Sequence, residues 1–248
     1  MKKTAFLTLI ISFSILLTGC SCEKVSKYPV EIGSHSAVTP VARSDRDWWM
    51  PRHEGVLEQV KDGNVDLIMI GDSITHGWDG KGKDVWQQYY APRNAVNMGF
   101  SGDRTQHVLW RLENGEIDGI DPKLAVIMIG TNNSNWQDNT AQEIADGIVA
   151  ICKKLRADLP QTKILILAIF PRGEGPSAQR EKNQLASEMA SKIADGKWIY
   201  YLDINDEFLD ENEILSKDIM PDLLHPNENG YKIWAEAIEP TVKKLMGE

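Results

Sequence analysis

The chain has 248 residues, of which 42% are hydrophobic and 25% charged, as in an ordinary folded domain rather than a disordered segment. This length is enough for one domain with a substantial hydrophobic core. The 36 acidic residues outnumber the 27 basic ones and give a net charge of -9. This charge argues against binding to nucleic acid and against electrostatic binding to an anionic membrane.

The chain begins with MKKTAFLTLIISFSILLTGC, in which two lysines and an apolar run precede small residues and Cys20. This is the pattern of a secretory signal, and it is too short and wrongly flanked to span a membrane stably. The ending LLTGC resembles a bacterial lipobox, which implies cleavage before Cys20 and a lipid on its sulfur; a plain signal peptide with a chance cysteine is the alternative. We therefore expect a signal peptide over 1–19 and an extracytoplasmic bacterial lipoprotein anchored through Cys20, in the periplasm or outer membrane.

The stretch 20–40 is polar and lacks periodicity, so we expect a lipid-anchored tether there and a folded domain over 41–248. Cys22 lies beside the anchor candidate, and Cys152 lies in the apolar stretch IVAICKKL, where a buried position is expected. The cysteines do not form an even, spaced set, and no Cys/His spacing suggests zinc. The sequence therefore predicts neither a disulfide framework nor a metal site.

Within the domain, short apolar runs alternate with helical patterns. The runs are continuous rather than alternating, which suits strands buried on both faces. We expect strands at 65–70, 95–100, 124–130, 163–170 and 198–204. We expect helices at 105–115, 140–159, 178–196 and 227–246, and one more within 46–64. Alternation of this kind predicts a parallel sheet with helices on both faces.

The segment IGDSITHG, residues 70–77, leaves the first predicted strand with Gly, Asp and Ser in a row. In an open parallel sheet, ligands bind beyond the carboxyl ends of the strands. Ser73 is expected there, at the opening of a helix or turn, where its backbone N–H and the helix dipole favour a developing negative charge. The alternative is that Ser73 only caps a helix.

A nucleophilic serine needs a base, and the base needs a group that orients it. Among the five histidines, His225 stands out because it precedes Pro226 in PDLLHPNENGY, which predicts a loop at the mouth of a helix. Asp222 lies three residues earlier, where a turn can fold its carboxylate onto the imidazole Nδ1 and leave Nε2 free for Ser73. The alternative is a capping aspartate and a surface histidine.

Two further strand exits carry candidate oxyanion donors. Gly102 in GFSGDRT offers an unobstructed backbone N–H, and Asn132 in GTNN offers a side-chain amide. Each is otherwise an ordinary polar turn after a strand. A doubly wound sheet gathers all these exits on one edge, so the set points to a single site.

Four segments, IGDSITHG, GFSGDRTQHVLWRL, IGTNN and DLLHP, resemble the signature blocks of the SGNH (GDSL-type) hydrolases, in the family's order. Within that family the chain is most similar to the catalytic subunits of brain-type platelet-activating-factor acetylhydrolase and their bacterial relatives, on RTQHVLWRLENGEIDGIDPKLAVIMIGTNN and ILILAIFPRGE. The resemblance covers about 64–245. It implies a flavodoxin-like three-layer α/β/α sandwich around a central parallel sheet, and an ester hydrolase that uses an acyl-serine without metal or cofactor.

By block matching, the resemblance implies Ser73 as nucleophile, His225 as general base and acid, and Asp222 as its orienting group. It implies an oxyanion hole made by the backbone N–H groups of Ser73 and Gly102 and the side chain of Asn132. No residue at these five positions departs from the family pattern, which argues against a binding lipoprotein that has lost the chemistry.

The resemblance also implies a short acyl group, acetyl first, and the expected location favours extracytoplasmic glycan or lipid esters as substrates. The alternatives are a lysophospholipase or thioesterase-like hydrolase and an O-acyltransferase with the same serine machinery. Trp78 and Trp136 are candidates for stacking on a sugar ring, with plain packing as the alternative. Brain-type subunits of the family pair up, so a homodimer is a further expectation.

Overall fold

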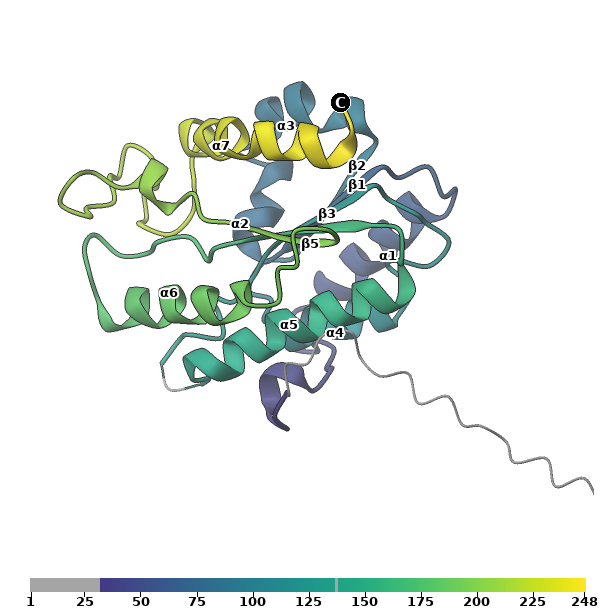
Figure 1. The fold of residues 1–248 in the computed structure, drawn as a ribbon, viewed down its shortest axis with the longest axis horizontal. Coiled ribbons are helices and arrows are strands. Elements are labelled where there is room, and N and C mark those ends of the chain that lie inside the picture. The colour runs from purple at the N-terminus through teal and green to yellow at the C-terminus, as the bar shows by residue number, and fades with distance from the viewer. Residues whose placement is uncertain (1–31, 137) are drawn as a thin grey trace, which may run out of the picture.

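The computed structural model describes residues 32–136 and 138–248 (Figure 1). The predicted signal peptide, the anchor candidate Cys20 and its neighbour Cys22 lie outside the described residues. Within the described part of the chain, no helix is both long and apolar enough to cross a bilayer.

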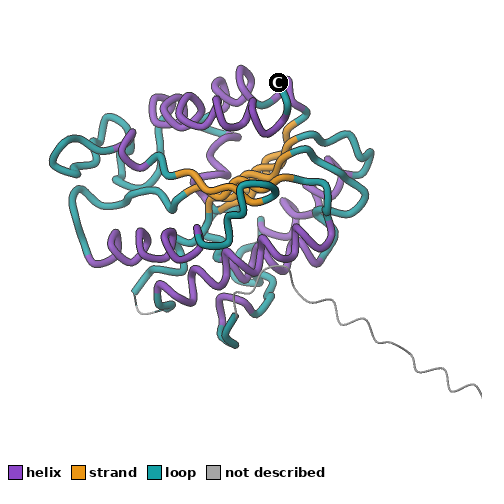
Figure 2. The backbone as a smooth tube through the Cα atoms, in the orientation of Figure 1, coloured by secondary structure: helices purple, strands orange, loops and turns teal. Residues whose placement is uncertain are grey.

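Among the described residues, five parallel strands form one central sheet in the order β2-β1-β3-β4-β5 (Figure 2). The strands are β1 Leu67–Gly71, β2 Ala95–Gly99, β3 Leu124–Met128, β4 Lys163–Leu167 and β5 Ile199–Leu202. This order is that of a flavodoxin-like doubly wound sheet, in which the order of strand addition reverses between β1 and β3. All five predicted strands are confirmed, each slightly shorter than its apolar run. The runs of β2, β3, β4 and β5 continue into the loop at the strand exit, whereas β1 begins two residues later than its run and ends one residue beyond it.

Helices cover both faces of the sheet (Figure 1). They are α1 Trp49–Val60, α2 Ser73–His76, α3 Lys83–Tyr89, α4 Thr105–Glu113, α5 Ala141–Asp158, α6 Ala178–Ser191 and α7 Glu228–Met246. Short 3-10 turns lie at Ser36–Val38, Gly77–Asp79, Ala91–Arg93 and Asn205–Phe208. The predicted three-layer α/β/α architecture is confirmed. Sequence analysis missed α3, which has seven residues and only one buried side chain, Val85, and so shows no helical periodicity.

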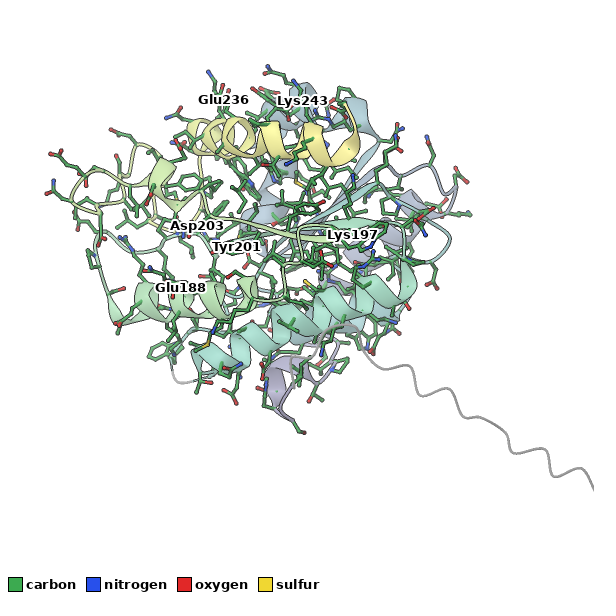
Figure 3. All side chains as sticks on the ribbon, in the orientation of Figure 1. Glu188, Lys197, Tyr201, Asp203, Glu236 and Lys243 are labelled. Atoms are coloured by element: carbon green, nitrogen blue, oxygen red, sulfur yellow. The ribbon has the colours of Figure 1, made fainter. Side chains whose placement is uncertain are left out.

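The two sides of the sheet bury separate apolar clusters because successive strand residues point to opposite faces. Ile68 and Ile70 of β1 pack with α1, α4, α5 and α6. Leu67 and Met69 pack with α2, α3 and α7. Glu236 and Lys243 lie on the outer surface of α7 (Figure 3). Continuous apolar runs are thus explained by burial on both faces.

The end of the predicted tether packs on the domain instead of hanging free. Ala37 is fully buried, and its carbonyl oxygen accepts a hydrogen bond of 2.7 Å from Thr105 Oγ1 in α4. His35 Nε2 lies 3.1 Å from Asp146 Oδ2 in α5. The folded unit therefore starts before residue 41. Polar residues with no periodicity gave no sign of this contact, because it depends on partners about 70 to 110 positions away.

Candidate active site

Ser73 lies at the first position of α2, just beyond the carboxyl end of β1. The helix is capped by Asp72, whose Oδ1 accepts a hydrogen bond of 3.0 Å from the backbone N–H of Ile74. Ser73 is therefore free of the capping role that was its alternative interpretation. From the opposite side, Tyr231 of α7 donates its hydroxyl to the carbonyl of Ile74 at 2.6 Å, which holds the short helix in place.

The loop before α7 brings His225 and Asp222 to Ser73. His225 Nε2 lies 2.8 Å from Ser73 Oγ, and its Nδ1 lies 2.7 Å from Asp222 Oδ2. With the ring neutral and the proton on Nδ1, that nitrogen donates to the carboxylate and Nε2 accepts from the serine hydroxyl. Residues 152 positions apart thus form one hydrogen-bonded chain from carboxylate to hydroxyl.

The local structure of the Asp222–His225 turn follows from its sequence. Asp222 Oδ1 accepts hydrogen bonds from the backbone N–H of His225 at 2.7 Å and of Leu224 at 3.1 Å, and Leu223 takes a positive φ of 60° between them. Partial burial opposes ionisation of Asp222, but the hydrogen bonds from His225 outweigh it and lower the carboxyl pKa. The carboxylate is therefore ionised at neutral pH and orients the imidazole.

The two predicted oxyanion donors lie on the exits of β2 and β3, the strands on either side of β1. Gly102 has φ +78°, and a Cβ there would lie 2.7 Å from Arg43 Nη1, so only glycine suits the position. Asn132 Nδ2 donates to the backbone carbonyl of Asp103 at 2.9 Å. The structure thus joins the Gly102 loop to the Asn132 loop.

Close approach of β2 to α2 also depends on a glycine. A Cβ on Gly99 would lie 2.2 Å from the backbone nitrogen of His76. Any other residue here would push the β2 exit, and the Gly102 loop after it, away from Ser73.

The other four histidines have separate partners. His35 faces Asp146, His53 Nδ1 lies 2.9 Å from Glu116 Oε1, and His107 Nδ1 accepts from the N–H of Arg104 at 3.0 Å. His76 Nδ1 lies 2.9 Å from Ser101 Oγ, and burial together with the Arg52 charge lowers the pKa of His76 to about 4. Among the histidines, all of which lie in the described part, His225 alone contacts Ser73.

The two candidate stacking tryptophans have different positions. Trp78 is 1% exposed and packs against Tyr90, Tyr231 and Trp234, so its interpretation as a sugar contact is wrong. Trp136 is 91% exposed, on the loop that follows Asn132. Both sit in similar polar stretches of sequence, so only packing distinguishes them.

Sequence reasoning missed two residues that hold the site loops. Arg172 Nη1 donates to Asn135 Oδ1 at 2.9 Å and to the carbonyl of Thr131 at 3.2 Å, which ties down the loop of Asn132. The backbone carbonyl of Asp103 accepts a hydrogen bond from the side-chain amide of Asn132. Both lie inside the quoted segments FPRGE and SGDRT, but a single arginine or aspartate carries no signal of its partner.

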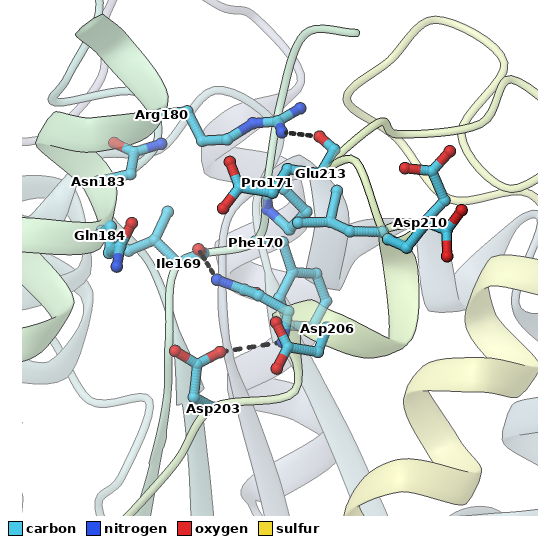
Figure 4. Close-up of a pocket in the computed structure, with 13 residues that line it drawn as sticks. Ile169, Phe170, Pro171, Arg180, Asn183, Gln184, Asp203, Asp206, Asp210 and Glu213 are labelled. Carbon is cyan, nitrogen blue, oxygen red and sulfur yellow. Dashed lines mark hydrogen bonds between the residues drawn. The ribbon is translucent and has the colours of Figure 1, made fainter. Parts of the chain in front are cut away.

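A separate cavity of about 500 Å³ lies beyond the carboxyl ends of β4 and β5, between the loops that follow those strands and α6 (Figure 4). Asp203, Asp206, Asp210 and Glu213 stand around it with Arg180 (Figure 4). Its lining includes neither Ser73 nor His225. Carboxylates make this space unfavourable for an apolar acyl chain, because burying them against hydrocarbon costs solvation free energy.

Asp72 gives the site a measurable pH dependence of stability. It is fully buried, and no described residue forms a hydrogen bond with its Oδ2. Burial, with the nearby Asp103 charge, raises the carboxyl pKa from 3.8 to about 7. Between about pH 4 and pH 7 this carboxyl is protonated in the folded state and ionised in the unfolded state. The stability that Asp72 contributes to the folded state is therefore fully present below about pH 4 and is lost as the pH rises to about 7.

We expect Asp72→Asn to remove that contribution to the pH dependence, because asparagine keeps the acceptor for Ile74 and cannot ionise. Relative to wild type, the variant should gain up to about 4 kcal/mol in unfolding free energy between pH 4 and pH 8. Urea unfolding of both proteins at several pH values measures this difference. Parallel stability curves for the two proteins would contradict the assignment.

The chain matches a known family over most of its folded part. The model of the GDSL-like lipase/acylhydrolase family matches residues 69–233, a range that includes Ser73, Asp222 and His225. Platelet-activating factor acetylhydrolase IB subunit alpha2 of Rattus norvegicus is 36% identical over 222 residues, covering 87% of this chain and 93% of the relative. The alpha1 subunit of Homo sapiens is 34% identical over 215 residues, covering 86% and 91%.

Solved structures show the same fold at lower identity. A GDSL-like lipase from Bacteroides thetaiotaomicron superposes with a TM-score of 0.60 at 22% identity, over 79% of this chain and 96% of the other. An acetylxylan esterase from Geobacillus stearothermophilus superposes with a TM-score of 0.57 at 20% identity, over 75% and 95%.

Proposed function

This chain belongs to the GDSL-like lipase/acylhydrolase family and is an ester hydrolase, and from that premise we propose that it removes short acyl groups, acetyl first, through an acyl-serine intermediate. The hydrogen-bonded chain Ser73–His225–Asp222, with distances of 2.8 and 2.7 Å, carries the proposal. In our assignment Ser73 is the nucleophile, His225 the general base and acid, and Asp222 the residue that orients it.

The reaction has two halves. In the first, His225 Nε2 takes the proton of Ser73 Oγ as that oxygen attacks the ester carbonyl, and the same nitrogen then protonates the leaving alcohol. Asp222 keeps Nδ1 protonated and stabilises the imidazolium that forms. In the second half, His225 Nε2 takes a proton from water as the water oxygen attacks the acyl-serine carbonyl. The same nitrogen then returns the proton to Ser73 Oγ, and the carboxylic acid is released.

Negative charge develops on the carbonyl oxygen in both halves. We assign its stabilisation to the backbone N–H groups of Ser73 and Gly102 and to the side-chain amide of Asn132, which come from the exits of three adjacent strands. In comparable sites the removal of one such donor costs about 3 kcal/mol of transition-state stabilisation. None of these steps requires a metal or cofactor.

The acetyl preference is supported by the names of related proteins. The rat relative is an acetylhydrolase, and a structural neighbour acts on acetylated xylan by its name. We propose an acetylated glycan or lipid outside the cytoplasm as the substrate, with the protein held at a membrane through a lipid on Cys20. A lysophospholipase or thioesterase-like hydrolase and an O-acyltransferase remain the alternatives that experiment must separate.

A series of 4-nitrophenyl esters from acetyl to octanoyl tests the acyl preference. We expect kcat/KM to fall at least about tenfold from acetyl to butanoyl and to continue falling, because each added methylene must fit a site built for a small group. A maximum at octanoyl would contradict the proposal and favour the lipase alternative. Transfer of acetyl to an added alcohol in preference to water would favour the acyltransferase.

A further inference from the structure

Two of the three assigned oxyanion donors depend on one residue, Asp103. Gly102 directly precedes it in the chain, and the amide of Asn132 donates to its backbone carbonyl at 2.9 Å. The backbone N–H of Asp103 donates in turn to the carbonyl of Phe100 at 3.0 Å. The peptide units on either side of Asp103 therefore locate donors from two different strand exits.

The side chain of Asp103 is fixed from two helices. It is fully buried, its Oδ1 accepts from Trp49 Nε1 at 2.7 Å, and its Oδ2 accepts from Arg111 Nε at 2.9 Å. Trp49 begins α1 and Arg111 belongs to α4. Charge-assisted hydrogen bonds of this kind, sheltered from water, hold a carboxylate in one position.

Arg111 is itself held on every side. Its guanidinium lies 3.9 Å from the centre of the Phe100 ring, donates to the carbonyl of Met98 in β2 at 3.2 Å, and pairs with the buried Glu116. Glu116 also contacts His53 of α1 at 2.9 Å. This buried ionic network links the exit of β2 to α1 and α4.

The network is larger than the packing of a surface loop requires. Burying several charged groups costs solvation free energy, and an apolar cluster of similar volume would stabilise the fold at least as well. Burial raises the pKa of Asp103 to about 6 despite the opposing charges of Arg111 and Arg43, so the carboxylate is ionised at neutral pH. What the network adds is a unique position for the loop.

We propose that Asp103 is a positioning residue of the oxyanion hole: Trp49 and Arg111 fix its carboxylate, and its backbone thereby places the Asn132 amide and the Gly102 N–H. This rests on the oxyanion donors proposed above. Preorganised donors stabilise the tetrahedral intermediate only if they lie within about 0.5 Å of their working positions. Loosening Asp103 should therefore lower kcat and leave KM almost unchanged, because the ground-state ester makes little use of these donors.

The sharpest variant is Trp49→Phe, which removes the Nε1 donor and keeps a ring against Phe100. The matched control is Trp110→Phe. Trp110 lies in the same aromatic cluster, 5.3 Å from Trp49 between ring centres, and no hydrogen bond among the described residues joins its indole to Asp103. Asp103→Asn is a second variant, since either orientation of its amide sets a donor against Trp49 or Arg111.

Rates are measured on 4-nitrophenyl acetate, per active site titrated with a fluorophosphonate. We expect kcat to fall about tenfold in Trp49→Phe, which is less than the fall caused by complete loss of one oxyanion donor. In Asp103→Asn we expect kcat to fall about a hundredfold, which is similar to the loss of one donor. KM should stay within about threefold, and Trp110→Phe should match wild type. Phenylboronic acid forms a tetrahedral adduct on a serine oxygen, so its inhibition constant should rise by the same factor as kcat falls.

Inactive wild-type protein would contradict the hydrolase assignment itself. Active wild type with equal kcat in Trp49→Phe and Trp110→Phe would overturn the positioning role of Asp103. So would a fall in kcat without a matching rise in the boronate constant, because the loss would then arise outside the oxyanion hole. If Asp103→Asn fails to fold, the tryptophan pair still decides the question.

Discussion

Replacement of Ser73 with alanine is expected to lower kcat on 4-nitrophenyl acetate by at least about 10⁴-fold, to a rate set by the remaining oxyanion donors. The reason is that no other hydroxyl in the described chain lies within hydrogen-bond reach of His225. Removing one half-buried hydroxyl should change the melting temperature little. Initial rates and a thermal melt on the same preparation give both quantities.

Ser101→Ala is the matched control for this variant. Ser101 Oγ also contacts an imidazole, that of His76 at 2.9 Å, but no hydrogen bond among the described residues joins the His76 ring to Ser73. Loss of one such hydrogen bond should leave at least about a tenth of the activity. Full activity in Ser73→Ala, or equal losses in the two variants, would refute Ser73 as the nucleophile.

His225→Ala is expected to cost nearly as much, at least about 10⁴-fold in kcat, because the serine hydroxyl is a weak nucleophile without a base. Nucleophile and base act as one unit, so the double variant Ser73→Ala/His225→Ala should be no slower than either single variant. Free imidazole added to His225→Ala should restore part of the rate, and should restore none in Ser73→Ala.

His35→Ala serves as the control for the base. His35 also faces a carboxylate, Asp146 at 3.1 Å, but lies on the N-terminal segment against α5. Its loss should leave kcat unchanged. If the fold-losses in kcat of the two single variants multiply in the double variant, Ser73 and His225 act independently. The proposed mechanism would then be wrong.

Much of the fold followed from local patterns. The five strands are continuous apolar runs because both faces of the sheet are buried, and the long helices α5 and α7 show one apolar face each. Elements with a weak local signal were missed. The helix α3 buries one residue, and the packed segment around Ala37 depends on α4 and α5 for its place.

The sequence by itself determined where the reactive groups lie along the chain: Ser73, Gly102, Asn132 and the Asp222–His225 pair all follow strands or precede a helix. A parallel sheet gathers strand exits on one edge, so their convergence could be predicted from order alone. What only the tertiary structure decided is how each group is held. Trp49 reaches Asp103 across 54 positions, and Trp78 is buried while Trp136 is exposed. These outcomes depend on side-chain packing between distant segments, which local residue patterns do not encode.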